Sequence, residues 1–261
     1  MTTSSSDIVL ITGANQGLGF ELARRLASDY PGYHILMGAR DISKGHEAVS
    51  KLKAEGLSVD GITIDVTDED SIKAAATDVA SKFGRLDVLV NNAGIVAEGK
   101  MPPGTSLQET FRACFDVNTF GSFLVTEAFA ALLKKSHNPR VVFMSTGLGS
   151  ITDRLNPDDQ CAAFQFPVYR SSKAALNMIM AHYAALYAKE GWKVNANDPG
   201  FCATNLNGYR GWNTPESGVV NALRLATLEK MDRLALLLVL RDLWVGSKGY
   251  HHDHHVSTES L

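Results

Sequence analysis

A tyrosine and a lysine four residues apart, Tyr169 and Lys173, are the side chains of this sequence best suited to acid–base chemistry. In a helix, positions i and i+4 lie on one face, so the phenol and the ammonium can meet. A phenol with an ordinary pKa of roughly 10 transfers protons poorly at neutral pH, and a nearby ammonium lowers that pKa. Taken alone, such a pair is commonplace, so the other motifs must decide its meaning.

Two hydroxyl side chains, Ser145 and Thr146, directly follow the apolar run from Arg140 to Met144, which has the composition of a buried strand. Successive side chains of a strand point to opposite faces, so one of the two hydroxyls is expected to reach a substrate.

A glycine-rich turn lies at the start of the chain. The apolar run from Ile8 to Ile11 predicts a strand buried on both faces, and a helical pattern follows Gly19. Between them stand glycines at positions 13, 17 and 19, where backbone N–H groups can approach a phosphate at a helix N-terminus. The alternative interpretation is a tight turn without a ligand.

The elements that must position these groups alternate along the chain. Apolar strand patterns at residues 8–11, 33–39, 61–66, 86–90, 140–144 and 192–196 are separated by helical patterns, and the last helix ends near Leu228. Such alternation predicts an α/β fold with a doubly wound parallel sheet in a single domain, residues 1–228. Arg40 follows the second strand, where an arginine accommodates the 2′-phosphate of NADP(H); the alternative is a surface arginine in a turn.

Five motifs occur in a fixed order: Thr12-Gly13-xxx-Gly17-x-Gly19, the tetrad from Asn91 to Gly94, Asn118 in a helix, the strand-end hydroxyls, and Tyr169-xxx-Lys173. With these motifs the sequence resembles the short-chain dehydrogenase/reductase family over nearly all of residues 8–228. It looks most like the NADPH-dependent carbonyl reductases of that family. The resemblance implies a Rossmann fold.

The resemblance also implies catalytic roles. The family's hydroxyl is usually the second of a serine pair, which selects Thr146, while Ser145 remains the alternative if the strand ends one residue earlier. Tyr169 would give a proton to a carbonyl oxygen, and Lys173 would lower the pKa of Tyr169 and bind the nicotinamide ribose. Asn118 would hold a water molecule through a distorted helix backbone.

Cofactor binding follows from the same resemblance. Asp65 matches the residue that contacts the adenine amino group, although it could equally be a turn aspartate, and Thr204 matches a contact of the nicotinamide carboxamide. A substrate lid is expected at about residues 202–213. The full set of expected NADP(H) contacts is Gly13, Asn15, Gln16, Gly17, Leu18, Gly19, Arg40, Asp65, Asn92, Ala93, Gly94, Tyr169, Lys173, Pro199, Gly200 and Thr204.

The implied activity is hydride transfer between NADP(H) and a small carbonyl or alcohol substrate, most readily the NADPH-dependent reduction of a ketone or aldehyde. Operation as an alcohol dehydrogenase is one alternative. A catalytically impaired NADP(H)-binding regulator or scaffold is another, motivated by Thr146 and by an atypical C-terminus.

Composition and net charge exclude several other classes of protein. The 261 residues carry a net charge of −3 and no basic block, which argues against nucleic acid or an anionic membrane as partner. The longest apolar run, Leu234 to Leu240, is too short to span a bilayer. Three separated cysteines have no metal-ligand spacing, and the N-terminus shows no secretory signal. We expect a cytoplasmic protein without a metal site, and by family resemblance a homo-oligomer.

The tail from residue 229 to 261 departs from the family. The codons AAG ATG GAC CGA CTG GCA CT would encode Lys230 to the start of Leu236, and the same bases read from the third position encode DGPTGT, the turn expected before a last strand. This suggests a shifted reading frame from about Met231. The rival hypotheses are a divergent tail whose run from Leu234 to Leu240 replaces the last strand, and a metal-binding histidine cluster at residues 251–255.

Overall fold

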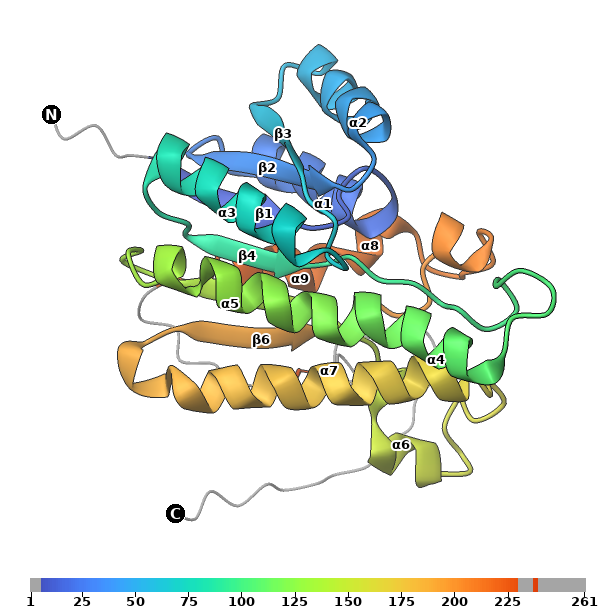
Figure 1. The fold of residues 1–261 in the computed structure, drawn as a ribbon. Coiled ribbons are helices and arrows are strands. Elements are labelled where there is room, and N and C mark those ends of the chain that lie inside the picture. Colours follow the sequence, from blue (N-terminus) through green and yellow to red (C-terminus); the bar gives the residue numbers. More distant parts are fainter. Residues whose placement is uncertain (1–5, 230–236, 239–261) are drawn as a thin grey trace, which may run out of the picture.

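A parallel β-sheet forms the centre of the structure, a computed structural model that describes residues 6–229 and 237–238 (Figure 1). The strands lie in the order β3-β2-β1-β4-β5-β6-β7, and each neighbouring pair is parallel. They are β1 (Asp7–Ile11), β2 (Tyr33–Ala39), β3 (Val59–Thr63), β4 (Val88–Asn91), β5 (Arg140–Met144), β6 (Lys193–Asn197) and β7 (Leu237–Leu238).

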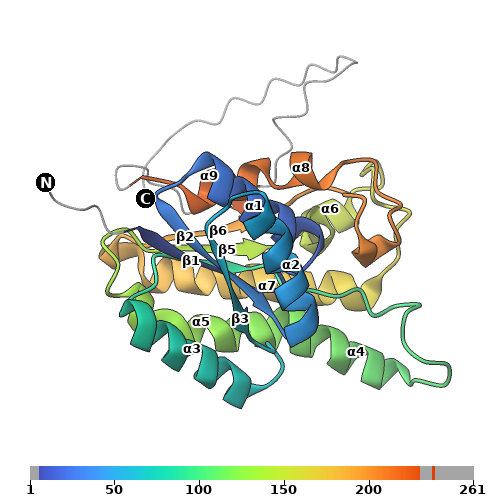
Figure 2. The same ribbon diagram turned by 90° about the horizontal axis from the view of Figure 1, so that it is seen from above.

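Helices cover both faces of this sheet, as the apolar strands require. Along β1, Val9 and Ile11 join the core beneath one helix layer, whereas Leu10 joins the core beneath the other. Figure 2 shows the two layers on opposite sides of the strands. One contains α1 (Gly17–Asp29), α2 (Ile42–Ala54), α8 (Pro215–Gly218) and α9 (Val220–Ala226); the other contains α3 (Glu69–Phe83), α4 (Leu107–Phe115), α5 (Ser122–Leu133) and α7 (Pro167–Leu186). The predicted doubly wound α/β fold is confirmed.

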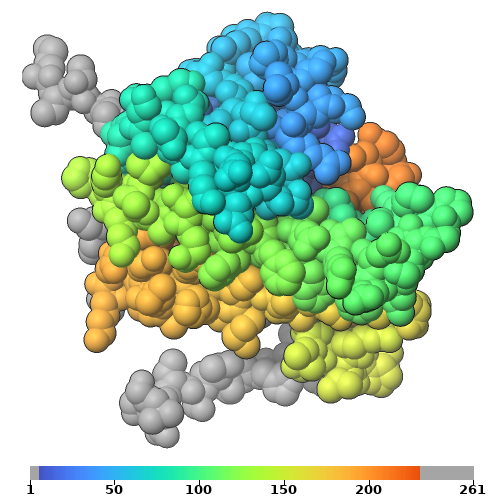
Figure 3. Space-filling view, viewed as in Figure 1, coloured from blue at the N-terminus to red at the C-terminus, as the bar shows by residue number. Residues whose placement is uncertain are grey.

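The order of the strands reverses at β1, which has β2 on one side and β4 on the other. In such sheets a crevice opens beyond the carboxyl ends of the strands at this switch point, and ligands bind there. Three segments gather at the same end of the molecule: the loop after β4, the residues around α6 (Ile151–Leu155) and the predicted lid (Figure 3). The topology therefore places the predicted site residues together.

Three predicted elements differ in detail from the observed ones. The fourth strand begins at Val88 rather than at residue 86. The third strand ends at Thr63 rather than at residue 66, because the Asp65 carboxylate accepts hydrogen bonds from the N–H and hydroxyl of Thr67 and so makes a turn. The helical region after residue 105 is not two plain helices. A π-helical turn, η1 (Asp116–Gly121), joins α4 to α5 and contains Asn118.

The tail predicted to be atypical lies largely outside the described residues, as does the histidine cluster. The frame-shift hypothesis therefore stays a prediction. Leu237 and Leu238 pair in parallel with Ala196 and Asn197 of β6. This pairing places a short seventh strand beside β6, and the rival hypotheses about the tail stay predictions.

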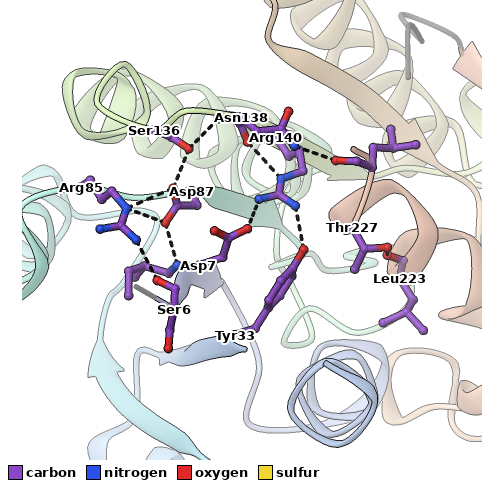
Figure 4. Close-up of polar contacts among 12 residues, drawn as sticks. Ser6, Asp7, Tyr33, Arg85, Asp87, Ser136, Asn138, Arg140, Leu223 and Thr227 are labelled. Atoms are coloured by element: carbon purple, nitrogen blue, oxygen red, sulfur yellow. Dashed lines mark hydrogen bonds and ion pairs between the residues drawn. The ribbon is translucent and has the colours of Figure 1, made fainter. Parts of the chain in front are cut away.

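A buried polar network joins the amino ends of the strands (Figure 4). The Arg140 guanidinium is almost fully buried; it pairs with the Asp7 carboxylate and donates to the Tyr33 hydroxyl at 2.8 Å. Asp87 accepts hydrogen bonds from the Ile8 N–H, the Ser136 hydroxyl and Arg85. Charged groups thus connect β1, β2, β4 and β5 at the amino ends of these strands, which lie opposite the crevice. In the described part of the chain, no helix is long and apolar enough to cross a membrane.

Candidate active site

The glycine turn after β1 is packed tightly against the end of β4. Gly13 and Gly17 have φ of +63° and +57°, which glycine adopts without strain. A Cβ on Gly19 would overlap the Asn92 side-chain nitrogen and lie 2.6 Å from the Gly13 carbonyl oxygen. Only glycine fits this position, so the turn keeps its backbone close to the crevice.

The first turn of α1 presents free N–H groups to that crevice. Its N-cap is Gln16, whose side chain makes no capping hydrogen bond within the described residues, and its first turn contains no acidic residue. A helix N-terminus left uncapped in this way suits an anion such as a diphosphate. The turn also contains the predicted contacts Asn15 and Leu18, which are half-buried.

Thr12 is a residue whose role the sequence analysis missed. Its hydroxyl oxygen accepts the N–H groups of Asn92 and Ala93, both at 3.0 Å. In return, the Asn92 amide donates to the carbonyl oxygens of Thr12 and Gly13 at 2.8 and 3.1 Å. Thr12 therefore locks the glycine turn to the NNAG segment, and its place directly before Gly13 was the available signal.

The two residues expected near the adenosine lie at neighbouring strand ends. Arg40 directly follows β2 and is exposed. Asp65 lies beyond β3 and is half-buried; one of its carboxylate oxygens bonds to Thr67, so the turn-aspartate interpretation describes part of its role. Asp68 caps α3 through the N–H groups of Asp70 and Ser71.

Tyr169 and Lys173 lie near the start of α7 and are both buried. The Lys173 ammonium donates to the Met144 carbonyl oxygen at 2.7 Å and lies 5.8 Å from the centroid of the Tyr169 ring. Glu98, which the sequence analysis did not single out, accepts the Tyr169 N–H at 2.7 Å and so caps α7 from the loop after β4. No sequence signal marked this contact, because the two residues are 71 positions apart.

The protonation of this pair differs from the expectation. Burial raises the pKa of the Tyr169 phenol above its ordinary value, and the negative charges of Asp198, Cys114 and Glu98 act in the same direction. Burial lowers the pKa of Lys173 to about 8. Desolvation is the main cause of both shifts, so the phenol remains protonated at neutral pH and can donate a proton.

Asn118 and the NNAG segment meet beside Lys173. The Asn118 amide exchanges two hydrogen bonds with the backbone of Ile95, at 2.8 and 2.9 Å, and lies within the π-helical turn. A Cβ on Gly94 would lie 3.3 Å from Asn118 Oδ1 and 3.5 Å from Lys173 Nζ. The structure therefore brings three of the predicted motifs into one place.

The two candidate hydroxyls have different surroundings. Ser145 is buried, and its hydroxyl donates to the Asn177 side chain at 2.5 Å. Thr146 is half-buried, and its oxygen accepts the Leu148 N–H at 3.2 Å, which leaves its hydroxyl proton available. Among the contacts between described residues, the Ser145 hydroxyl proton has an acceptor and the Thr146 hydroxyl proton has none.

The segment after β6 returns to the glycine turn. Asp198 accepts the N–H of Gly147 at 2.7 Å and that of Gly200 at 2.9 Å, and burial raises the pKa of its carboxyl. Pro199 precedes Gly200, which has a φ of +71°. Thr204 is buried, with its side chain 3.7 Å from where a Cβ on Gly17 would stand.

The predicted lid is closed at its base. Ala203 donates its N–H to the Asn213 carbonyl at 2.8 Å, and Asn213 donates to Phe201 at 3.1 Å. Lys100, from the loop after β4, donates to the Leu206 carbonyl. The lid is thereby closed on itself at its base and held to the loop after β4, while Tyr209 and Trp212 remain exposed.

Comparison with known proteins agrees with this geometry. The sequence profile of the short chain dehydrogenase family matches residues 7–213. The short-chain dehydrogenase anuI of Penicillium roqueforti is 41% identical over 232 residues, which cover 87% of this chain and 91% of that protein. Salutaridine reductase from Papaver somniferum has a similar structure, with a TM-score of 0.75 and 26% identity over 87% of this chain and 97% of that one.

An NADPH-bound carbonyl reductase from chicken fatty liver is also similar, with a TM-score of 0.74 and 28% identity over 86% of this chain and 93% of that one. The profile covers most of this chain, and the fungal relative covers 87% of it. The protein is therefore a member of the short-chain dehydrogenase/reductase family of oxidoreductases.

Proposed function

We propose that this protein is an NADPH-dependent reductase of ketones or aldehydes. The observation that carries the proposal is the burial of the Tyr169 phenol and the Lys173 ammonium on one helix, with Lys173 next to the Gly94 segment that packs on the glycine turn. The likeness to a carbonyl reductase with NADPH bound supports both the reaction and the cofactor.

In this reaction Tyr169 donates its proton to the carbonyl oxygen. Thr146 orients that oxygen through its free hydroxyl proton, because its own oxygen is already engaged by the Leu148 N–H. Lys173 stays positively charged below pH 8 and favours the phenolate that the proton transfer leaves behind. General acid assistance of this kind contributes roughly 100- to 10,000-fold.

The cofactor, when bound, supplies the hydride that reduces the carbonyl carbon. The residues present fit it: the uncapped start of α1 and the glycine turn would hold its diphosphate. Arg40 at the end of β2 would hold the 2′-phosphate and so select NADPH over NADH. Lys173 would bind the nicotinamide ribose, and Thr204 its carboxamide. That the protein is cytoplasmic and forms a homo-oligomer stays a prediction.

The test is to measure NADPH oxidation by the purified protein with a panel of ketones and aldehydes, together with the dissociation constant of NADPH. We expect turnover that Tyr169→Phe abolishes while the variant still binds NADPH. Tight NADPH binding with no turnover on any carbonyl, in either direction, would instead support the regulator alternative.

A further inference from the structure

Arg170 is a buried arginine with no carboxylate partner within salt-bridge distance among the described residues. It follows Tyr169 on α7 and is 8% exposed. Its guanidinium donates to three backbone carbonyls: those of Phe164 at 3.0 Å, Leu148 at 3.3 Å and Cys161 at 2.7 Å. Burial and the nearby Arg154 lower the pKa of this guanidinium.

These three carbonyls belong to the segments directly before and after α6. Leu148 stands two residues after the Thr146 hydroxyl, and Cys161 and Phe164 lie in the irregular stretch between α6 and α7. A planar guanidinium can serve several acceptors at once in fixed directions, which a lysine ammonium cannot reproduce. Arg170 therefore ties that stretch, residues 156–166, to the catalytic helix.

The tied stretch contributes to a row of aromatic rings. The Phe164 centroid lies 6.3 Å from that of Phe166 and 5.7 Å from that of Phe201. The Phe201 ring in turn lies 4.9 Å from Trp212 of the lid, at a near-perpendicular angle of 70°. The row thus runs from the residue before α7 to the lid, and Phe166 and Trp212 at its ends are exposed.

We propose that Arg170 is a positioning residue that sets substrate specificity by holding Phe164 in this aromatic row, which binds the aromatic side of a carbonyl substrate. The inference rests on the proposed reductase function. Aromatic rings recognise flat apolar groups through offset-stacked or edge-to-face contacts. Loops held by a rigid scaffold element are where specificity is set.

The experiment compares two vicinal diketones that differ by one ring, 2,3-butanedione and 1-phenyl-1,2-propanedione. For Arg170→Lys we expect KM for the phenyl compound to rise about tenfold while kcat changes little. For 2,3-butanedione, kcat and KM should stay within about twofold of wild type, as should NADPH affinity. Ser171→Ala, at the next and exposed helix position, is the matched control and should behave as wild type.

A second variant distinguishes the loss of an aromatic ring from a general loss of stability as the cause of the rise in KM. Phe164→Leu removes the ring and leaves the backbone carbonyl that Arg170 binds, so it should produce the same phenyl-specific rise in KM. Combining it with Arg170→Lys should add little, because both changes act through one ring. Equal losses on the two diketones, or additive effects of the two substitutions, would overturn the proposal.

Two measurements do not depend on turnover. Backbone amides of residues 156–166 should exchange hydrogen at least tenfold faster in Arg170→Lys than in wild type or Ser171→Ala. Calorimetry should show about tenfold weaker binding of the phenyl diketone to the NADPH-loaded variant. If wild type reduces neither diketone but both results hold, the aromatic site stands, and the panel of ketones and aldehydes alone decides the reductase proposal. Unchanged exchange and unchanged binding would refute the role of Arg170.

Discussion

At the scale of single residues, the free hydroxyl proton of Thr146 carries the first prediction. Thr146→Val should lower kcat by roughly 100-fold or more, since the carbonyl oxygen loses its orienting donor. Ser145→Ala should lower kcat less than tenfold, because the Ser145 hydroxyl already donates its proton to the Asn177 side chain. Steady-state kinetics of both variants decide the matter, and the reverse ranking would show that Ser145 faces the substrate.

Arg40 makes a prediction about the cofactor. Arg40→Asp should weaken NADPH binding by on the order of 2–4 kcal/mol, because a charge-assisted bond to phosphate is replaced by repulsion. NADH binding should change little. Titration of both cofactors measures the difference, and equal losses would mean that Arg40 does not contact the 2′-phosphate.

Lys173 makes a prediction about pH. Its pKa of about 8 lies below the ordinary value, so the ammonium loses its proton as the pH rises through 8. The Tyr169 pKa is raised, so the phenol stays protonated over the same range. In the reductive direction kcat/KM should therefore be flat from pH 6 to about 7.5 and fall above pH 8.

The free energy of unfolding should rise with pH over part of the range in which kcat/KM falls. Between pH 8 and the ordinary lysine pKa, the unfolded chain binds a proton that the folded Lys173 does not, so this group makes the free energy of unfolding rise with pH. Melting curves at each pH serve as the control. Loss of activity that follows loss of folded protein would contradict the assignment to Lys173.

At the scale of elements, the contact between the glycine turn and Asn92 can be tested with a matched pair. Gly19→Ala places a Cβ against the Asn92 side chain and the Gly13 carbonyl, whereas a Cβ on Gly32 meets nothing within 4 Å. Gly19→Ala should cost about 1–3 kcal/mol of unfolding free energy and weaken NADPH binding. Gly32→Ala should leave both unchanged, as urea denaturation and NADPH titration will show.

The elements also show what the sequence could predict. Buried parallel strands are short apolar runs, so β1, β2 and β5 were recognised within one residue of their observed bounds. Candidate site residues could be singled out where they stand directly after such a strand, as Ser145 and Thr146 do, or at helical spacing, as Tyr169 and Lys173 do.

Contacts between distant segments could not be predicted in this way. The hydrogen bond from the Tyr169 N–H to Glu98, and those from Arg170 to three carbonyls, depend on how loops fold. Loops have no periodicity in the sequence. The raised pKa of Tyr169 follows from its burial in the folded protein, which the four-residue spacing of Tyr169 and Lys173 does not report.

At the scale of the whole molecule, the network at the amino ends of the strands should support stability without affecting catalysis. Asp7→Ala leaves the buried Arg140 guanidinium without its carboxylate and should cost about 2–3 kcal/mol, given that Asp7 is one-third exposed. Asp78→Ala, which breaks the exposed pair with Lys82, should cost less than about 0.5 kcal/mol. Denaturation measures both effects, and a changed kcat in folded Asp7→Ala would contradict the separation.

The amino ends and the carboxyl ends of the strands would then be under different selective pressures. Residues at the amino edge, such as Arg140 and Asp87, hold four strands together far from any substrate, so they define a frame that tolerates little variation. The loops at the carboxyl ends of the strands are attached to that frame. Their sequences can diversify without destabilising it. A library that randomises residues 156–166 and 205–212 on an unchanged amino edge should therefore yield many folded variants with altered substrate ranges. The same number of changes spread over the whole chain should yield few.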